Sequence, residues 1–191
     1  MTSILKVSEI QDPTNSNTAL TIDTAGVVTG KVNESRQIVM GFTLTSGVSG
    51  DANPITGWAN MATQLSGDGA GEITTGGSVS ESSGTFSFPT TGLWKIEFNA
   101  SLEGGSGDTT VQYNMDTTQD NSSYSSLIQV KESTYTSTAK AHTTMVGLLK
   151  VTDTTNDKVR FRQLSFGGHT TEGSTSEALT YVFFTWLGVA S

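Results

Sequence analysis

Few side chains in this sequence are suited to acid–base or nucleophilic chemistry, and they are scattered. The chain has no cysteine and only two histidines, His142 and His169, which excludes thiol nucleophiles, disulfides, iron–sulfur clusters and thiolate zinc sites. The histidines are far apart in the sequence and match no HExxH-type motif. The many serines are not accompanied by a G-x-S-x-G motif. The sequence therefore predicts a protein that is not an enzyme, with no catalytic residue and no cofactor.

Acidic residues in turns supply hard oxygen ligands of the kind that calcium prefers. They are Asp116, Asp120, Asp153 and Asp157. Their spacing is not that of an EF-hand, and aspartate is common in β-turns for conformational reasons. No metal site is assigned, and a bound calcium ion is left open.

Two tyrosines stand among small hydroxyl side chains, Tyr124 in SSYSS and Tyr135 in STYTS. A rigid aromatic ring beside adaptable hydroxyl groups suits recognition of a glycan or a protein, so both are candidate ligand-binding residues. The alternative is that each ring folds back onto its own strand. Further along, alternation places three basic side chains on one strand face, which is either solvated or meets an acidic partner: Lys158, Arg160 and Arg162.

The composition favours strands. Of 191 residues, 32 are Thr and 24 are Ser, and 21 glycines separate the segments. Thr is stiff at χ1, and Ser competes locally for backbone hydrogen bonds, so helices are disfavoured. The formal net charge is −8, the wrong sign for neutralising phosphates, and the longest apolar stretch is too short to cross a bilayer. We expect an all-β protein that binds no nucleic acid and inserts in no membrane.

Residues 1–35 differ from the rest in having few aromatic residues and a turn-rich run before the alternating segment 19–23. A reversal at 24–26 predicts a small hairpin, which is marginal by itself in water and needs a partner surface. We predict that this segment attaches the protein to a larger particle. The candidate anchoring residues are Leu5, Val7, Ile10, Leu20 and Ile22.

Residues 36–191 read as a succession of strands separated by Gly, Ser, Asp and Asn clusters, the pattern of a β-sandwich. The clearest strand is 94–102, with apolar residues at every second position. The same period of two recurs at 86–88, 111–115 and 158–164. Helical spacing appears only at 58–65, where flanking Pro and Gly limit a helix to one or two turns.

Two later segments, 145–149 and 180–187, are apolar at successive positions, which implies that both faces of their sheet are covered. So much exposed apolar area is unusual on a soluble monomer. We expect the last strand to line a subunit interface around a symmetry axis, with cover by the N-terminal segment as the alternative. The predicted interface residues are Tyr181, Phe183, Phe184, Trp186 and Leu187.

Taken in order, these strands resemble the jelly-roll head of the complement and tumour-necrosis-factor superfamily in its bacterial and phage form. The resemblance rests on residues 84–96 (GTFSFPTTGLWKI), on the late strand pair around the acidic turn at 153–157, and on the last strand, 181–187. It covers roughly residues 37–190 as a pattern of spacings. The resemblance implies a jelly-roll β-sandwich that forms homotrimers packed by the final strand.

The first 30 residues resemble the opening of virion fibre and decoration proteins of tailed phages, in the segments LKVSEIQDP (5–13) and ALTIDTAGVV (19–28). That resemblance implies docking onto other virion proteins, in the capsid or the tail. The expected protein is a trimeric structural appendage of the virion. An alternative is a receptor-binding fibre tip that recognises host surface polysaccharide, and a third is a depolymerase, for which the chain is short.

Overall fold

The computed structural model describes residues 9–11, 18–22, 28–30, 37–65, 71–105, 109–134, 139–165 and 167–189. The chain divides into two compact units, Met1–Arg36 and Gln37–Ser191. The first unit contains an antiparallel three-stranded sheet of β1 (Glu9–Gln11), β2 (Thr18–Ile22) and β3 (Val28–Gly30). The predicted hairpin corresponds to β2 and β3, which pair with Ile22 opposite Val28, and β1 adds a strand that the sequence analysis did not predict.

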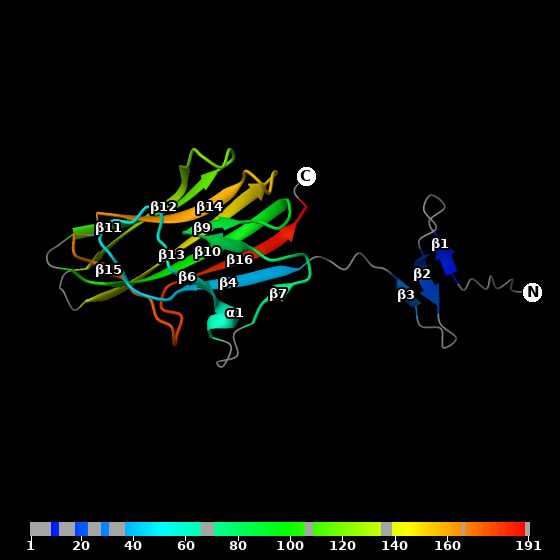
Figure 1. Ribbon diagram of the computed structural model, residues 1–191, viewed down its shortest axis with the longest axis horizontal. Coiled ribbons are helices and arrows are strands. Elements are labelled where there is room, and N and C mark those ends of the chain that lie inside the picture. The colour runs from blue at the N-terminus through cyan, green and yellow to red at the C-terminus, as the bar shows by residue number, and fades with distance from the viewer. Residues whose placement is uncertain are drawn as a thin grey trace, which may run out of the picture. The chain divides into compact units, whose positions relative to one another are not determined.

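The second unit, here called the head, consists of two antiparallel sheets packed face to face in a jelly-roll sandwich (Figure 1). The long strands of the first sheet are β4 (Ile38–Leu44), β10 (Gly92–Glu103), β13 (Lys140–Val151) and β16 (Tyr181–Gly188). Short strands extend it: β5 (Val48–Ser49), β6 (Trp58–Asn60), β7 (Ile73–Thr74) and β15 (Thr170–Thr171). The strand β10 pairs with β13 along one edge and with β16 along the other, and β16 pairs in turn with β4.

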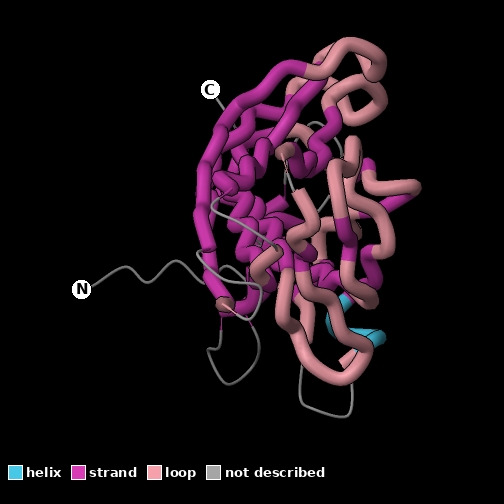
Figure 2. Tube along the Cα trace, turned by 90° about the vertical axis from the view of Figure 1, so that its left-hand side faces the viewer, coloured by secondary structure: helices cyan, strands magenta, loops and turns pink. Residues whose placement is uncertain are grey.

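The second sheet has the order β12-β11-β14-β9-β8. Its strands are β8 (Ser80–Ser82), β9 (Thr85–Ser87), β11 (Thr109–Thr118), β12 (Ser125–Thr134) and β14 (Lys158–Leu164). The predicted short helix is α1 (Met61–Gln64), where the side chain of Asn60 accepts a hydrogen bond from the Thr63 amide at 3.1 Å and caps the first turn. In Figure 2 the strands form a curved wall, and α1 lies among loops on the other side.

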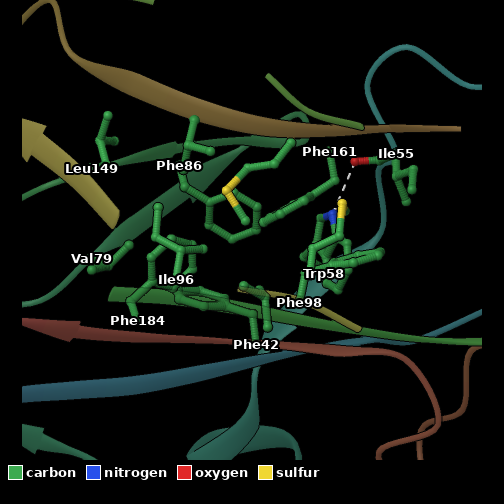
Figure 3. Close-up of a cluster of buried hydrophobic side chains, with 14 of the residues drawn as sticks. Phe42, Ile55, Trp58, Val79, Phe86, Ile96, Phe98, Leu149, Phe161 and Phe184 are labelled. Atoms are coloured by element: carbon green, nitrogen blue, oxygen red, sulfur yellow. Dashed lines mark hydrogen bonds between the residues drawn. The ribbon is translucent and has the colours of Figure 1, made fainter. Parts of the chain in front are cut away.

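The core between the sheets is rich in aromatic rings, because the alternating strands send one side chain in two inward. Phe98 of the first sheet stacks on Phe161 of the second with ring centroids 4.6 Å apart, and Phe86 packs on Phe184 at 5.0 Å. Figure 3 shows these rings pointing toward one another from both sheets. The indole nitrogen of Trp58 donates to the carbonyl of Ile55 at 3.0 Å, which satisfies its polar atom inside the core.

The turn before β10 depends on a glycine. Gly92 has φ +136°, and a Cβ atom there would lie 2.4 Å from the carbonyl oxygen of Gly188. A side chain at this position would be both conformationally strained and too close to the backbone of β16. Gly92 thus sets the register in which Trp94 enters the core, where it is completely buried and its Nε1 donates to the Thr90 carbonyl at 3.2 Å.

Replacing Phe184 by Ala should lower the free energy of unfolding by about 3–5 kcal/mol, because a completely buried ring is removed from the core. Urea unfolding at one fixed protein concentration measures the change. Val189→Ala, at a side chain that is 84% exposed, is the control and should stay within about 0.5 kcal/mol of the parent. Equal stability of the two variants would contradict the core placement of Phe184.

Candidate interaction surfaces

The outer face of the first sheet carries apolar side chains that the described part of the head leaves uncovered. Along β16, Tyr181 and Phe183 are half-buried, and Leu187 is 51% exposed. On β13, Val146 and Leu148 are 49% and 57% exposed. These five side chains are here called the apolar face. A monomer in water seldom exposes such a set on one sheet, and surfaces of this kind are usually interfaces.

The strand β10 runs between the two rows of the apolar face and contributes polar groups. Pairing places Glu97 opposite Phe183 on one side and opposite Val146 on the other. Its carboxylate lies 2.9 Å from Nζ of Lys95, and this ion pair neutralises the charge between the rows. The face is therefore apolar at both flanks with a self-paired polar strip in its middle, which is the kind of surface that a second protein surface can bury at low electrostatic cost.

The ring of Phe183 lies close to the backbone of β4 because its paired residue there, Gly41, has no side chain. A Cβ atom on Gly41 would stand 2.7 Å from Cε1 of Phe183 and 3.2 Å from Sδ of Met61. The helix α1, which carries Met61, thus borders the ring on this side. Any larger residue at position 41 would push the ring outward and change the shape of the apolar face.

The structure corrects the sequence-based assignment of Phe184 to the subunit interface. Phe184 is completely buried between the sheets of its own protomer. Trp186, which was also predicted to lie in the interface, is partly buried and packs against the same core. Its Nε1 donates to the Thr91 carbonyl at 3.1 Å. The inner face of β16 therefore belongs to the core, and of the predicted set only Tyr181, Phe183 and Leu187 point outward.

Val146 and Leu148 complete the apolar face but were not among the predicted interface residues. The sequence shows their segment as apolar at successive positions, and the register of β13 with β10 shows which of its side chains point outward.

At the Tyr181 end, the apolar face continues into a hollow of about 310 Å³ lined by Asn99, His142, Thr144, Leu179 and Tyr181, among others. In it the hydroxyl of Thr144 donates to the side-chain oxygen of Asn99 at 2.7 Å.

The outer face of the second sheet is polar. Along β11, Asn114, Asp116 and Thr118 point outward but are only 2%, 2% and 3% exposed. The amide of Asn114 accepts from Gln112 at 2.7 Å and donates to the Ser126 hydroxyl at 2.8 Å. Longer polar side chains of neighbouring strands thus cover the β11 groups, and hydrogen bonds satisfy them, as buried polar groups require.

Asp116 is the centre of this surface because two arginines of β14 converge on it. Nη2 of Arg162 donates to Oδ1 at 3.2 Å, while Nε of Arg160 lies 3.8 Å from Oδ2. Nε of Arg162 is 2.9 Å from Oδ2, but its N–H does not point at that oxygen, so this contact is an ion pair and not a hydrogen bond. The predicted basic strip is therefore tied to an acid on the next strand. Its third member, Lys158, donates to the Thr154 carbonyl at 2.7 Å.

Tyr124 lies on the same surface, with its ring centroid 3.8 Å from Cζ of Arg160 in a cation–π contact. The preceding turn holds it there, because Oδ1 of Asp120 accepts from the amides of Ser122 and Ser123 at 2.9 and 2.7 Å. Hydrogen bonds from the Ser123 amide and the Thr118 hydroxyl hold the pKa of Asp120 well below its usual range. The other predicted tyrosine, Tyr135, lies outside the described residues.

The acidic turns use their oxygens internally. Oδ2 of Asp157 accepts from the amides of Thr152 and Asp153 at 2.5 and 3.0 Å, and Asp153 accepts from the Thr155 amide at 2.7 Å. Hydrogen bonds from the Thr155 amide, and after it from the Asn156 amide and side chain, lower the pKa of Asp153. The described part of the chain contains no group of three His, Cys, Asp or Glu residues that could hold a metal ion.

Of the predicted anchoring residues, Leu5 and Val7 lie outside the described residues. Ile10 falls in β1, and Leu20 and Ile22 fall in β2. Their attachment role stays a prediction. No helix among the residues that the structure describes is long and apolar enough to span a bilayer.

Comparisons with known proteins show the fold. No family model and no curated protein matches the sequence. Solved structures that match include the tumour necrosis factor Eiger from S. frugiperda, with a TM-score of 0.60 at 16% identity, covering 82% of this chain and 96% of that one. Murine APRIL crystallised at pH 5.0 matches with a TM-score of 0.56 at 11% identity, covering 79% of this chain and 99% of that one. The expected all-β, tumour-necrosis-factor-like jelly roll is thereby confirmed.

Asp116→Asn should lower the free energy of unfolding by about 1–3 kcal/mol, because the two arginines keep their charge and lose the carboxylate that neutralises it. Because the guanidinium groups are partly exposed, solvent screens their charge and limits the loss of unfolding free energy. Urea unfolding provides the measurement. Glu177→Gln, at an exposed acid, removes the same charge elsewhere and should change stability by no more than about 0.5 kcal/mol. An unchanged Asp116→Asn protein would show that this cluster is not stabilising.

Proposed function

We propose that this protein is a structural component of a tailed-phage virion: a homotrimeric, non-enzymatic surface appendage, anchored through residues 1–35 to other virion proteins of the capsid or tail. The head projects from the particle and decorates its surface. The observation that carries the proposal is the apolar face, which the described part of the head leaves in contact with water.

Three properties of the apolar face support self-association. Its exposed side chains lie on the central strand β16 and on β13, so they are held by a rigid sheet and need little ordering on binding. The charges among them are paired within the protomer. A closed ring of copies buries such a face without leaving a free end, and a threefold ring is what the resemblance of the head implies.

The first unit supports attachment to a partner. It contains three short strands of three, five and three residues, a sheet too small to be stable by its own core. Such a segment gains stability when it adds to a larger surface. The resemblance of residues 5–28 to the opening of phage fibre and decoration proteins supports a virion as the particle.

The purified protein should sediment at about 60 kDa, three times the 20.1 kDa of one chain, at micromolar concentration. Phe183→Glu and Leu148→Glu each place a carboxylate in the apolar face. Burying this charge in the interface without a partner is costly, so each variant should yield monomers of about 20 kDa. Analytical ultracentrifugation measures the mass.

Ser80→Glu adds the same charge at an exposed position of the second sheet and should leave the mass unchanged. A parent protein that sediments as a monomer, or glutamate variants that remain trimeric, would contradict the proposed interface.

Electron microscopy of purified particles labelled with an antibody against the head tests the virion assignment. We expect label at regular sites on the capsid or the tail. Label confined to the lysate, with none on the particles, would exclude a structural role whatever the oligomeric state.

A further inference from the structure

We propose that the outer face of β11, β12 and β14 binds carboxylate-bearing polysaccharide, with Arg160 and Arg162 holding the carboxylate and Tyr124 beside them contacting the sugar ring. This site lies on the sheet opposite the apolar face. It deepens the proposed function, since it names a ligand class for an appendage that projects from a particle. Each protomer carries the whole site, so it does not depend on the trimer.

Charge is segregated in the head. Seven of the ten Lys and Arg residues follow Gln37, and register places four of them on this one sheet face: Lys131, Lys158, Arg160 and Arg162. Of the three acids on the five strands of this sheet, Glu81 and Glu132 pair with core residues and so occupy inner positions. Asp116 is the remaining one. The strands of this face thus carry four basic side chains and one acid in a protein with a net charge of −8, and Asp120 lies in the turn before Tyr124.

The donors of this surface exceed the acceptors that the described residues offer. Two guanidinium groups carry ten N–H donors, whereas one carboxylate has about four acceptor positions. Nη2 of Arg162 donates to one oxygen of Asp116. The Nε atoms of both arginines are buried and make no hydrogen bond, so the donors that a ligand can use are those of the outer guanidinium nitrogens. The side chains of Arg160 and Arg162 are 22% and 25% exposed, so a ligand in solution reaches them. A second carboxylate completes the coordination that Asp116 begins.

The neighbouring groups suit a sugar better than a protein surface. Gln129 and Lys131 are exposed on β12, and Gln112 and Ser126 add further amide and hydroxyl groups on the same face. The half-buried ring of Tyr124 is fixed by Arg160 and by the Asp120 turn. A polar sheet face with one aromatic ring held in place and few apolar side chains matches a hydroxyl-rich, carboxylated ligand.

Binding to immobilised polygalacturonate, with neutral dextran as the reference, tests the site in the full-length protein. We expect binding to polygalacturonate that weakens as salt is raised, and none to dextran. Arg162→Gln should weaken binding about tenfold, since it removes a charge-assisted contact. Lys131→Gln and Gln129→Glu alter exposed residues and should weaken it about two- to fivefold without affecting folding.

Lys150→Gln is the charge-matched control on the first sheet and should bind as the parent does. Thermal unfolding and sedimentation of every variant separate a lost site from a lost fold or a lost trimer. Three results would overturn the proposal: no binding to polygalacturonate, equal binding to dextran, or equal weakening by Lys150→Gln. A protein that binds polygalacturonate as a monomer would keep this site while contradicting the proposed trimer.

Discussion

The central strand β16 carries apolar side chains on both of its faces, and a two-layer sandwich buries only one of them. Its inward residues, Val182 and Phe184, pack completely between the sheets. Its outward residues have no second layer above them in the described part of the head. The described strands and loops of the head thus cover less apolar surface than β16 presents, and the proposed assembly follows from this constraint.

The two outer faces of the sandwich differ in which side chains they expose. The first sheet pairs the charges of Lys95 and Glu97 with each other and leaves leucine, valine and phenylalanine outward. The second sheet buries Asn114 and Asp116 under longer polar side chains and leaves guanidinium groups at its surface. One face therefore loses little by being covered with protein, whereas the other face is chemically suited to remain in solvent and bind ions.

Much of the fold follows from local pattern. The alternation at 158–164 predicts β14 with its observed bounds, and that at 94–102 predicts all but the ends of β10. The strand β12 is not among the predicted strands, since serines dominate its start and its apolar residues are few. The alternation of side chains along a strand divides β16 into two faces. It does not show which face is the inner one, and the prediction that Phe184 lies in the interface was therefore wrong.

The polar surface was less predictable for a different reason. Asp116 and Arg162 are 46 positions apart and meet only because β11 and β14 are neighbours in the sheet. The sequence shows a basic strip and an aspartate that was expected in a turn but lies within β11, and nothing local indicates that they neutralise each other. The serines around Tyr124 made it a candidate ligand-binding residue, but its contact with Arg160 depends on the same strand order.

The two surfaces are compatible because they lie on opposite sides of one sandwich. In a ring closed through the apolar face of each head, the second sheet of every head would face outward. Assembly would therefore leave the polar surface uncovered. Ion-pair contacts with a single carboxylated sugar are weak in water because salt and solvent screen them. In the proposed trimer, three linked heads would raise the effective concentration at the second and third contact, so a repeating polysaccharide would be bound more firmly by three heads than by one.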